Sequence, residues 1–278
     1  MGENISIKLL KSLKRGRKQL SREAQERIAG FVLSQRTEEG TFMDKSGRPD
    51  LYYTLFGWML SYVLGIATDK KKQKAYLASL DTGCLDLIHY AAYMRCRMVL
   101  NPFSSTKIKA LEDFNNVPHN DRQSPYTQFV WLSLSEDTGN RIRNKKEIVD
   151  SLAPYRSETG GYRNTIDGLS ATTNATVAAL AIKGQFEGYR DNADVGFLSR
   201  LQQSSGGFGA AEASPVPDLL STATSLFMLS CYGVKPVYEA RDFIESHWLD
   251  SGGFSATLLD DTSDVEYTFY GLLAMGSN

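Results

Sequence analysis

Apolar residues recur along the chain in six runs, each opened by a polar residue, and this pattern predicts six buried helices. Three of the runs share a close pattern, in which Asp is followed three residues later by Tyr or Ser, then by Thr, then by an apolar stretch. The six runs start at Asp50, Asp86, Gln123, Asp167, Asp218 and Asp264. Their spacings of 36, 37, 44, 51 and 46 residues each accommodate one helical hairpin, so the pattern indicates six hairpin repeats.

The polar residue at the start of each run predicts where the helix begins. A carboxylate in this place accepts hydrogen bonds from the unpaired N–H groups of the first turn, so the Asp residues are expected to be N-caps. Stretches such as 55–60 and 225–229 are apolar on nearly all sides, which predicts inner helices covered on both faces. More polar segments between them predict amphipathic outer helices over 23–34, 70–80, 145–152, 191–202 and 238–246.

Four of the runs follow a glycine-rich turn that ends in an aromatic residue, namely Phe42, Tyr162, Phe208 or Phe254. Glycine permits positive φ and close backbone approach, and the aromatic ring can close the end of the hairpin. Together with the repeats, these turns predict an all-α fold, an (α/α)6 toroid of six helical-hairpin repeats over residues 21–278. Residues 1–20 are expected to form a basic N-terminal segment in front of it.

Positive charge is concentrated in that N-terminal segment. It carries Lys8, Lys11, Lys14, Arg15, Arg17 and Lys18, with leucine and isoleucine residues between them. One interpretation is a basic amphipathic helix that touches an anionic surface or a partner. The interpretation we favour is a terminal helix packed on the body of the protein with its charges in solvent.

Composition narrows the class of protein. The 278 residues are 42% hydrophobic and 23% charged, as in soluble globular proteins, and no apolar run has the length of a transmembrane helix. Lys and Arg number 31 against 32 acidic residues, so no overall positive field favours a nucleic-acid partner. Three cysteines are too few for a disulfide framework, and no signal peptide is recognised, so we expect a cytoplasmic location.

The repeats resemble the prenyltransferase and squalene-oxidase repeat family, which includes the β subunits of protein prenyltransferases and the terpenoid cyclases. The segment Phe197-x4-Gln202-x3-Gly206-x-Phe208 is similar to the Gln…Gly…Trp motif of the cyclases, with Phe in place of Trp. The resemblance covers roughly residues 21–278. It implies a central cavity lined by the inner helices, which takes an isoprenoid chain, its diphosphate or another long apolar substrate. The resemblance also leaves open that the protein binds a partner subunit.

Aromatic residues of the inner helices are the expected lining of such a cavity. The candidate substrate-binding residues are Tyr53, Trp58, His89, Tyr93, Tyr126, Trp131, Tyr267 and Tyr270, with Tyr52 and Tyr90 beside them. Because helix-spaced aromatics are more often core residues, we expect about half of them to be simply packed.

The resemblance also locates the zinc ligands of the protein prenyltransferases. They are an Asp and a Cys two residues later in the fifth repeat, and a His three residues after the Asp of the last repeat. The corresponding residues here are Asp218, Leu220 and Tyr267. Leucine and a neutral phenol do not replace thiolate and imidazole on zinc, so we predict no zinc and no other cofactor.

The anion-binding positions are replaced as well. Where the family has His, Arg and Lys around the diphosphate, this register gives Asp167, Glu212 and Pro215. Asp86 and His89 lie one helical turn apart and form a weak candidate metal half-site, but the interpretation we favour is a capping Asp beside a hydrogen-bonded His.

Carboxylates are the remaining candidates for chemistry. The Asp residues at the helix starts would gather at one end of the ring, where like charges raise one another's pKa and favour general acid catalysis. The catalytic candidates are Glu266, Asp264, Asp218 and Asp167. Glu266 is the best of them because the repeat gives it no capping role. The Asp-x-Asp-Asp motif of the alkene-protonating cyclases does not occur.

Three hypotheses for function follow from these residues. The leading one is a divergent prenyltransferase- or terpenoid cyclase-like enzyme that acts on an isoprenoid at a site different from the zinc constellation. The second is a non-catalytic toroid that binds a lipid or a protein. The third is a carboxylate-pair enzyme acting on glycans, which needs two carboxylates across an open polar cleft.

Overall fold

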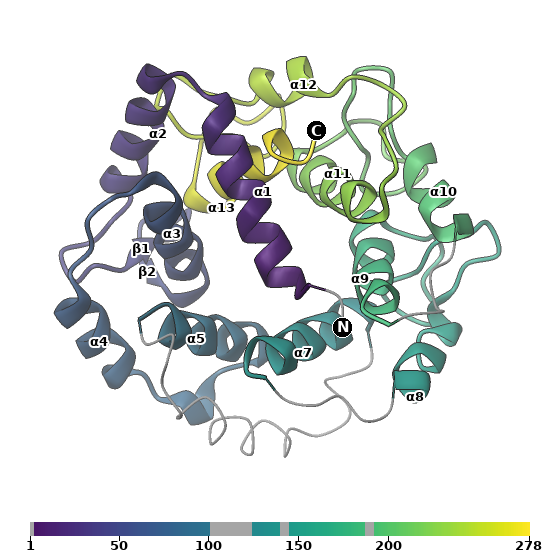
Figure 1. Cartoon of the computed structure of the whole chain (residues 1–278), viewed down its shortest axis with the longest axis horizontal. Coiled ribbons are helices and arrows are strands. Elements are labelled where there is room, and N and C mark those ends of the chain that lie inside the picture. Colours follow the sequence, from purple (N-terminus) through teal and green to yellow (C-terminus); the bar gives the residue numbers. More distant parts are fainter. Residues whose placement is uncertain (1–2, 101–123, 140–144, 187–191) are drawn as a thin grey trace.

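The helices form two concentric rings (Figure 1) in a computed structural model that describes residues 3–100, 124–139, 145–186 and 192–278. The inner ring consists of α3 (Leu51–Leu64), α5 (Leu87–Leu100), α7 (Pro125–Asp137), α9 (Thr173–Gly184), α11 (Leu219–Tyr232) and α13 (Val265–Met275). The outer helices of the described residues are α2 (Arg22–Ser34), α4 (Lys70–Ser79), α8 (Lys145–Asp150), α10 (Asn192–Arg200) and α12 (Arg241–Ser246). The short elements are the 3-10 helices η1 (Thr82–Cys84) and η3 (Ala153–Tyr155) and the antiparallel strands β1 (Phe42–Met43) and β2 (Pro49–Asp50). Each inner helix contacts the next, and α13 contacts both α11 and α3, so the ring is closed and the predicted all-α toroid is confirmed.

Three of the predicted caps begin their helices as expected. The Oδ1 atoms of Asp50, Asp218 and Asp264 accept the N–H groups three residues later at 2.9, 2.7 and 2.8 Å. The carboxylate of Asp86 does the same for the N–H of His89 at 2.8 Å. The start expected at Gln123 lies outside the described residues, and α7 is capped by Ser124.

Asp167 is a correction, because it caps no helix. Helix α9 begins five residues further on, with Thr172 as its N-cap. The pairing of Tyr162 with Thr172 matches the pairings of Phe208 with Asp218 and of Phe254 with Asp264, so Thr172 occupies the equivalent position. Asp167 lies exposed in the preceding loop, and only its loose match to the repeat pattern made it resemble a cap.

The threonine of the repeat joins each hairpin turn to its inner helix. In the fifth repeat the hydroxyl of Thr222 accepts the backbone N–H of Phe208 at 2.9 Å and donates to the carbonyl of Asp218 at 2.7 Å. The same acceptor role belongs to Thr54, Thr176 and Thr268, which receive the N–H groups of Phe42, Tyr162 and Phe254. The four aromatic residues are almost fully buried, so they close the hairpin ends as predicted.

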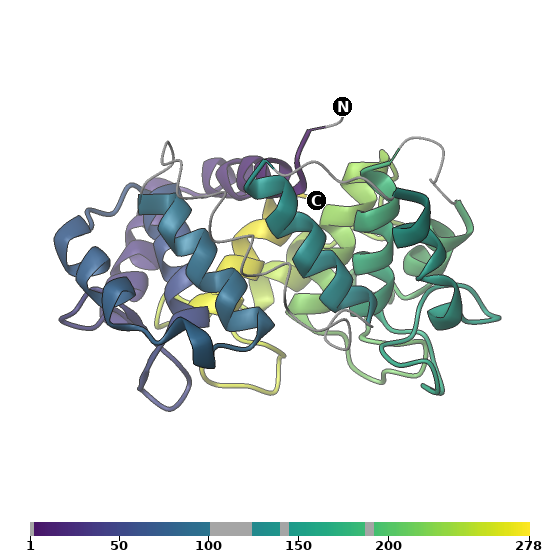
Figure 2. The ribbon, with the colours of Figure 1, turned by 90° about the horizontal axis from the view of Figure 1, so that it is seen from below.

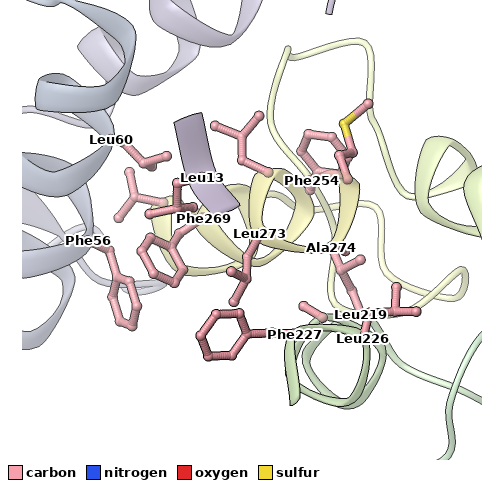
Figure 3. Close-up of a cluster of buried hydrophobic side chains, with 14 of the residues drawn as sticks. Leu13, Phe56, Leu60, Leu219, Leu226, Phe227, Phe254, Phe269, Leu273 and Ala274 are labelled. Atoms are coloured by element: carbon pink, nitrogen blue, oxygen red, sulfur yellow. The ribbon is translucent and has the colours of Figure 1, made fainter. Parts of the chain in front are cut away.

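The basic segment forms α1 (Ile5–Gln19), which lies across the end of the ring where the inner helices finish (Figures 1 and 2). Arg15 donates to the carbonyl of Gly276 at 2.9 Å, and Arg17 donates to the carbonyl of Val63 at 2.9 Å. These carbonyls stand at helix C-termini, where the partial charge is negative and a cation is favourable. Leu13, on the inner face of α1, is fully buried and joins the apolar core of the ring (Figure 3).

The loops that precede the inner helices project at the opposite end of the ring from α1 (Figure 2). The helix starts with their capping carboxylates therefore lie at that end, which we call the mouth. Between the mouth and α1, the core contains Phe56, Phe269, Leu273 and Phe227 from three neighbouring inner helices (Figure 3).

Candidate active site at the mouth

Glu266 is the centre of the candidate site. It lies in the first turn of α13, half-buried, and its Oε1 accepts a hydrogen bond of 2.8 Å from the hydroxyl of Tyr52 in the first turn of α3. The Tyr52 ring packs edge-on against Phe56 with ring centroids 4.8 Å apart, which fixes its position. Burial raises the pKa of Glu266 above its ordinary value of 4.5, the Tyr52 hydrogen bond acts against this, and the charge of Asp264 adds to it. The carboxyl group is therefore biased towards its neutral form.

Four further tyrosines surround this carboxyl group. The hydroxyl of Tyr53 lies close enough to Glu266 to favour its charged form. Burial and then the charge of Glu266 raise the pKa of Tyr126 and Tyr270, and they raise that of Tyr267 to about 12. Tyr126 belongs to α7, on the far side of the ring from α13 (Figure 1), so the charge of Glu266 influences a phenol of the opposite helix. All of these phenols keep their protons at neutral pH and present hydrogen-bond donors and aromatic faces around one acid.

Asp264 stands beside this cluster with a lysine that the sequence did not single out. Its Oδ1 caps the N–H of Tyr267, and its Oδ2 lies 3.6 Å from Nζ of Lys45. Lys45 Nζ also lies 4.9 Å from the centroid of the Tyr267 ring. Burial raises the pKa of Asp264 although the cap and Lys45 favour its charge. Lys45 comes from the turn between β1 and β2, and no local pattern indicates that this turn reaches the last repeat.

His89 connects two of the capping carboxylates. Its Nδ1 lies 2.9 Å from Oδ1 of Asp86, and its Nε2 lies 3.6 Å from Oδ2 of Asp50. Burial alone would lower the pKa of His89, but the hydrogen bond and charge of Asp86 and the charge of Asp50 raise it. Both ring nitrogens face carboxylates, which favours the protonated form of His89 in this group of three side chains. In the described part of the chain no group of three or more His, Cys, Asp or Glu side chains could bind a metal ion.

The residues at the family's zinc positions do not fit zinc. The carboxylate of Asp218 is used as a cap by the N–H of Ser221, Leu220 offers no donor atom, and Tyr267 is a neutral phenol. The charge of Asp218 contributes to the raised pKa of Tyr267, so these two positions lie within electrostatic range of each other. No step of a mechanism is therefore assigned to zinc.

The other predicted residues lie away from Glu266 or pack against neighbours. Trp58 is 2% exposed and donates its indole N–H to the carbonyl of Gly40 at 2.9 Å, so it packs against the hairpin turn and we remove it from the candidate site. Tyr93 and Trp131 are half-buried on the apolar cluster between α5 and α7. Asp167 is exposed, and Glu212, also exposed, lies 4.0 Å from Arg200.

A closed ring of helical hairpins with its polar site at the inner-helix starts defines the class as an α/α toroid. A family model described as prenyltransferase alpha-alpha toroid domain matches residues 5–138 and, a second time, residues 69–276. The chain belongs to this family. The two overlapping matches are what internal repeats produce.

Two other comparisons add little beyond the fold. A crystal structure of a protein from Actinoplanes is similar, with a TM-score of 0.57 and 12% identity over 92% of this chain and 97% of that chain. At this identity the likeness concerns the fold alone. No curated protein matches the chain significantly. No helix among the described residues combines the length and the hydrophobicity needed to cross a membrane.

Proposed function

We propose that this toroid is a terpenoid cyclase-like enzyme that takes a neutral isoprenoid chain into its mouth and transforms it by proton transfer from Glu266, without a metal. The observation that carries the proposal is the position of Glu266, a half-buried carboxyl group with a raised pKa among five tyrosines. A neutral carboxylic acid is the form that can give a proton, and the burial of Glu266 shifts its titration towards that form.

The residues around Glu266 suit the course of such a reaction. A proton would pass from Glu266 to a double bond of the chain, and the resulting positive charge would lie near the faces of Tyr52, Tyr267 and Tyr270. Attack by a second double bond would close a ring. Loss of a proton to the Glu266 carboxylate would then regenerate the acid, so the product is an isomer of the substrate and no co-reactant is needed.

Charge at the mouth favours a neutral substrate over a diphosphate. Asp50, Asp86, Asp218 and Asp264 stand at neighbouring helix starts, whereas Lys45 is already engaged by Asp264. Four carboxylates would repel a diphosphate at short range, and the helix N-termini that could attract it are already capped. We therefore expect prenyl alcohols and hydrocarbons to bind better than prenyl diphosphates. Because three cysteines are too few for a disulfide framework, we place the enzyme in the cytoplasm.

Binding is tested by thermal shift with farnesol, geranylgeraniol and their diphosphates. A ligand at 100 times its Kd stabilises the fold by about 2.7 kcal/mol, which gives a clear increase in Tm. We expect the alcohols to raise the Tm more than the diphosphates. The absence of a shift with all four compounds would overturn the isoprenoid assignment, and a larger shift with the diphosphates would overturn the neutral-substrate assignment.

Turnover is tested by gas chromatography and mass spectrometry after incubation with the compounds that bind. Glu266→Gln retains an acceptor for the Tyr52 hydroxyl but has no acidic proton, so it should bind the substrate and form no isomer. Glu212→Gln, at the same end of the ring but exposed, should behave like the wild type. Binding without any product in the wild type would instead support a non-catalytic lipid-binding toroid.

A further inference from the structure

The basic helix α1 uses its positive residues in two different ways. It carries six of them over Ile5–Gln19 and no acidic residue, in a chain whose net charge is −1. Arg15 and Arg17 reach back to the ring and donate to carbonyls at the C-terminal ends of α13 and α3. The two arginines therefore fasten α1 to the ring, but this does not account for the lysines.

Three of the lysines form a row on the outward side of α1. Lys11, Lys14 and Lys18 are exposed, and their spacings of three and four residues place them on one side of the helix. Ser12 and Gly16, on the opposite side, are buried against the ring. Because α1 lies along the end of the ring (Figure 2), the row of lysines faces away from the molecule.

Two apolar side chains accompany the lysines. Ile7 extends the row four residues before Lys11 and is 48% exposed, and Tyr62, in the last turn of α3, is 59% exposed. Nζ of Lys14 lies 4.7 Å from the centroid of the Tyr62 ring, so the tyrosine borders the row. We call these five residues, Ile7, Lys11, Lys14, Lys18 and Tyr62, the α1 face. Lysines next to apolar side chains are the combination with which an amphipathic helix lies in the interface of a bilayer.

The charge of the α1 face is only partly balanced by its neighbours. Lys11 forms an ion pair with Glu3, whereas Lys14 donates to the neutral hydroxyl of Tyr62 at 3.3 Å. Positive charge therefore remains for a negatively charged surface. Nucleic acid would match the lysines but would leave Ile7 in water. An anionic bilayer offers acidic headgroups to the lysines and an interfacial layer to isoleucine and tyrosine.

We infer that the α1 face docks on an anionic phospholipid bilayer. In this orientation α1 lies flat on the headgroups, the lysines contact the lipid phosphates and carboxylates, and Ile7 and Tyr62 enter the interface. The attachment is peripheral and reversible, because the face of one helix provides it. The mouth is at the opposite end of the ring and stays open, so the inference does not depend on the reaction proposed there.

Sedimentation with lipid vesicles tests the inference on the full chain. We expect the protein to pellet with vesicles that contain phosphatidylserine and to bind weakly to pure phosphatidylcholine. Salt should release it from the anionic vesicles, because salt screens the attraction between the lysines and the headgroups. Each lysine close to an anionic surface strengthens binding by about fivefold, so the variant K11Q/K14Q/K18Q should bind about 100-fold more weakly.

A second lysine variant controls for the loss of net charge. K70Q/K71Q/K74Q makes the same change in net charge on exposed positions of the outer helix α4, and it should bind the vesicles like the wild type. All six lysines are exposed, so both variants should keep the wild-type Tm. Equal losses of vesicle binding in the two variants would overturn the inference, because net charge rather than the α1 face would then be responsible.

The apolar part of the face is tested separately. Ile7→Gln keeps every lysine and should weaken vesicle binding by up to about tenfold, at high salt as well as at low salt. Leu169→Gln is the matched control, because Leu169 is fully exposed in a loop at the mouth. Three results would overturn the inference: no pelleting of the wild type with anionic vesicles, equal effects of the two leucine and isoleucine variants, or tighter binding to a DNA duplex than to the vesicles.

Discussion

At the scale of single residues, the threonines of the repeat connect each hairpin turn to the inner helix that follows it. Each lies in the first turn of an inner helix, and its hydroxyl accepts the N–H of the aromatic residue that closes the preceding hairpin. That N–H is buried and has no other acceptor in the helix, so the hydroxyl both satisfies it and positions the ring.

Thr222→Val tests this role, because valine keeps the shape and removes the hydroxyl. The N–H of Phe208 then stays buried without a partner, and we expect the free energy of unfolding to fall by about 1–3 kcal/mol. Thr224→Val is the matched control, since the hydroxyl of Thr224 bonds only to carbonyls of its own helix. Its effect should stay within about 0.5 kcal/mol. Urea denaturation measures the free energy of unfolding of both variants, and equal losses would contradict the role assigned to Thr222.

Glu136 predicts a pH dependence of stability. Burial and then the charge of Asp137 raise its pKa to about 7, although the N–H of Ile5 and the charge of Lys8 oppose this. Between its ordinary value of 4.5 and about 7, the folded state holds this proton and the unfolded state does not. The free energy of unfolding must therefore fall as the pH rises through that window. In Glu136→Gln this proton is absent, so the free energy of unfolding, measured by urea denaturation from pH 4.5 to 7, should depend less on pH. The exposed Glu158→Gln should keep the wild-type profile.

At the scale of elements, α1 and α13 approach each other closely enough to touch backbone to backbone. A Cβ atom on Gly16 would lie 2.0 Å from the carbonyl oxygen of Leu272, and one on Gly276 would lie 1.8 Å from that of Ser12. The contact lets Arg15 and Gln19 reach the terminal carbonyls of α13. Gly16 and Gly276 are therefore required for α1 to pack this closely on α13.

Gly16→Leu should separate α1 from α13. Overpacking of this kind costs about 1–3 kcal/mol, and the lysines and arginines of α1 should become accessible to trypsin before the rest of the chain. Gly30→Ala is the control, because Gly30 lies in α2 with open space around it and should gain about 0.5–1 kcal/mol. Urea denaturation and limited trypsin digestion are the measurements. Trypsin resistance equal to that of the wild type would show that α1 tolerates the side chain.

A buried ion pair joins α9 to α10. Asp194 is fully buried, and its Oδ2 lies 2.7 Å from Nζ of Lys183 and 3.2 Å from the hydroxyl of Tyr162. Removing only the carboxylate with Asp194→Leu takes the shared counter-charge from the buried Lys183 ammonium and from Arg156, which lies 2.9 Å from Oδ1, and should cost about 3–5 kcal/mol. Adding Lys183→Met removes the charge as well, and most of the loss should be recovered. A double variant no more stable than Asp194→Leu in urea denaturation would contradict this explanation.

How far the sequence predicts each element depends on whether the signal is local. An Asp before an apolar run is a local signal, and the starts of α3, α11 and α13 follow it. The start of α9 was misplaced because Asp167 resembles a cap, whereas the actual cap, Thr172, is recognised only by its pairing with Tyr162. The same register singles out Glu266 as a candidate, because it gives this residue no capping role, and its catalytic role stays a prediction.

At the scale of the whole molecule, the ring brings together residues that no local pattern relates. Tyr52 and Glu266 are separated by 214 positions and share a hydrogen bond because α13 closes the ring against α3. Lys45 reaches Asp264 for the same reason. The repeat register predicted that the helix starts gather at one end, but which side chains meet across the interior depends on their lengths and rotamers, which the register does not contain.

The ring register can be tested by restoring what the family's zinc site requires. If the register is right, the variant carrying both L220C and Y267H places a thiolate and an imidazole beside Asp218, which together are a zinc donor set. We expect the wild type to show no stoichiometric metal by elemental analysis and no change in Tm with zinc or EDTA. The double variant should bind one equivalent of zinc. Zinc should raise its Tm and EDTA should reverse that increase, because a metal that binds only the folded state stabilises it. Either single substitution supplies two donors and should respond much less. Zinc bound by the wild type would mean that its ligands were misplaced, and a double variant that folds but ignores zinc would mean that α11 and α13 do not bring these positions together.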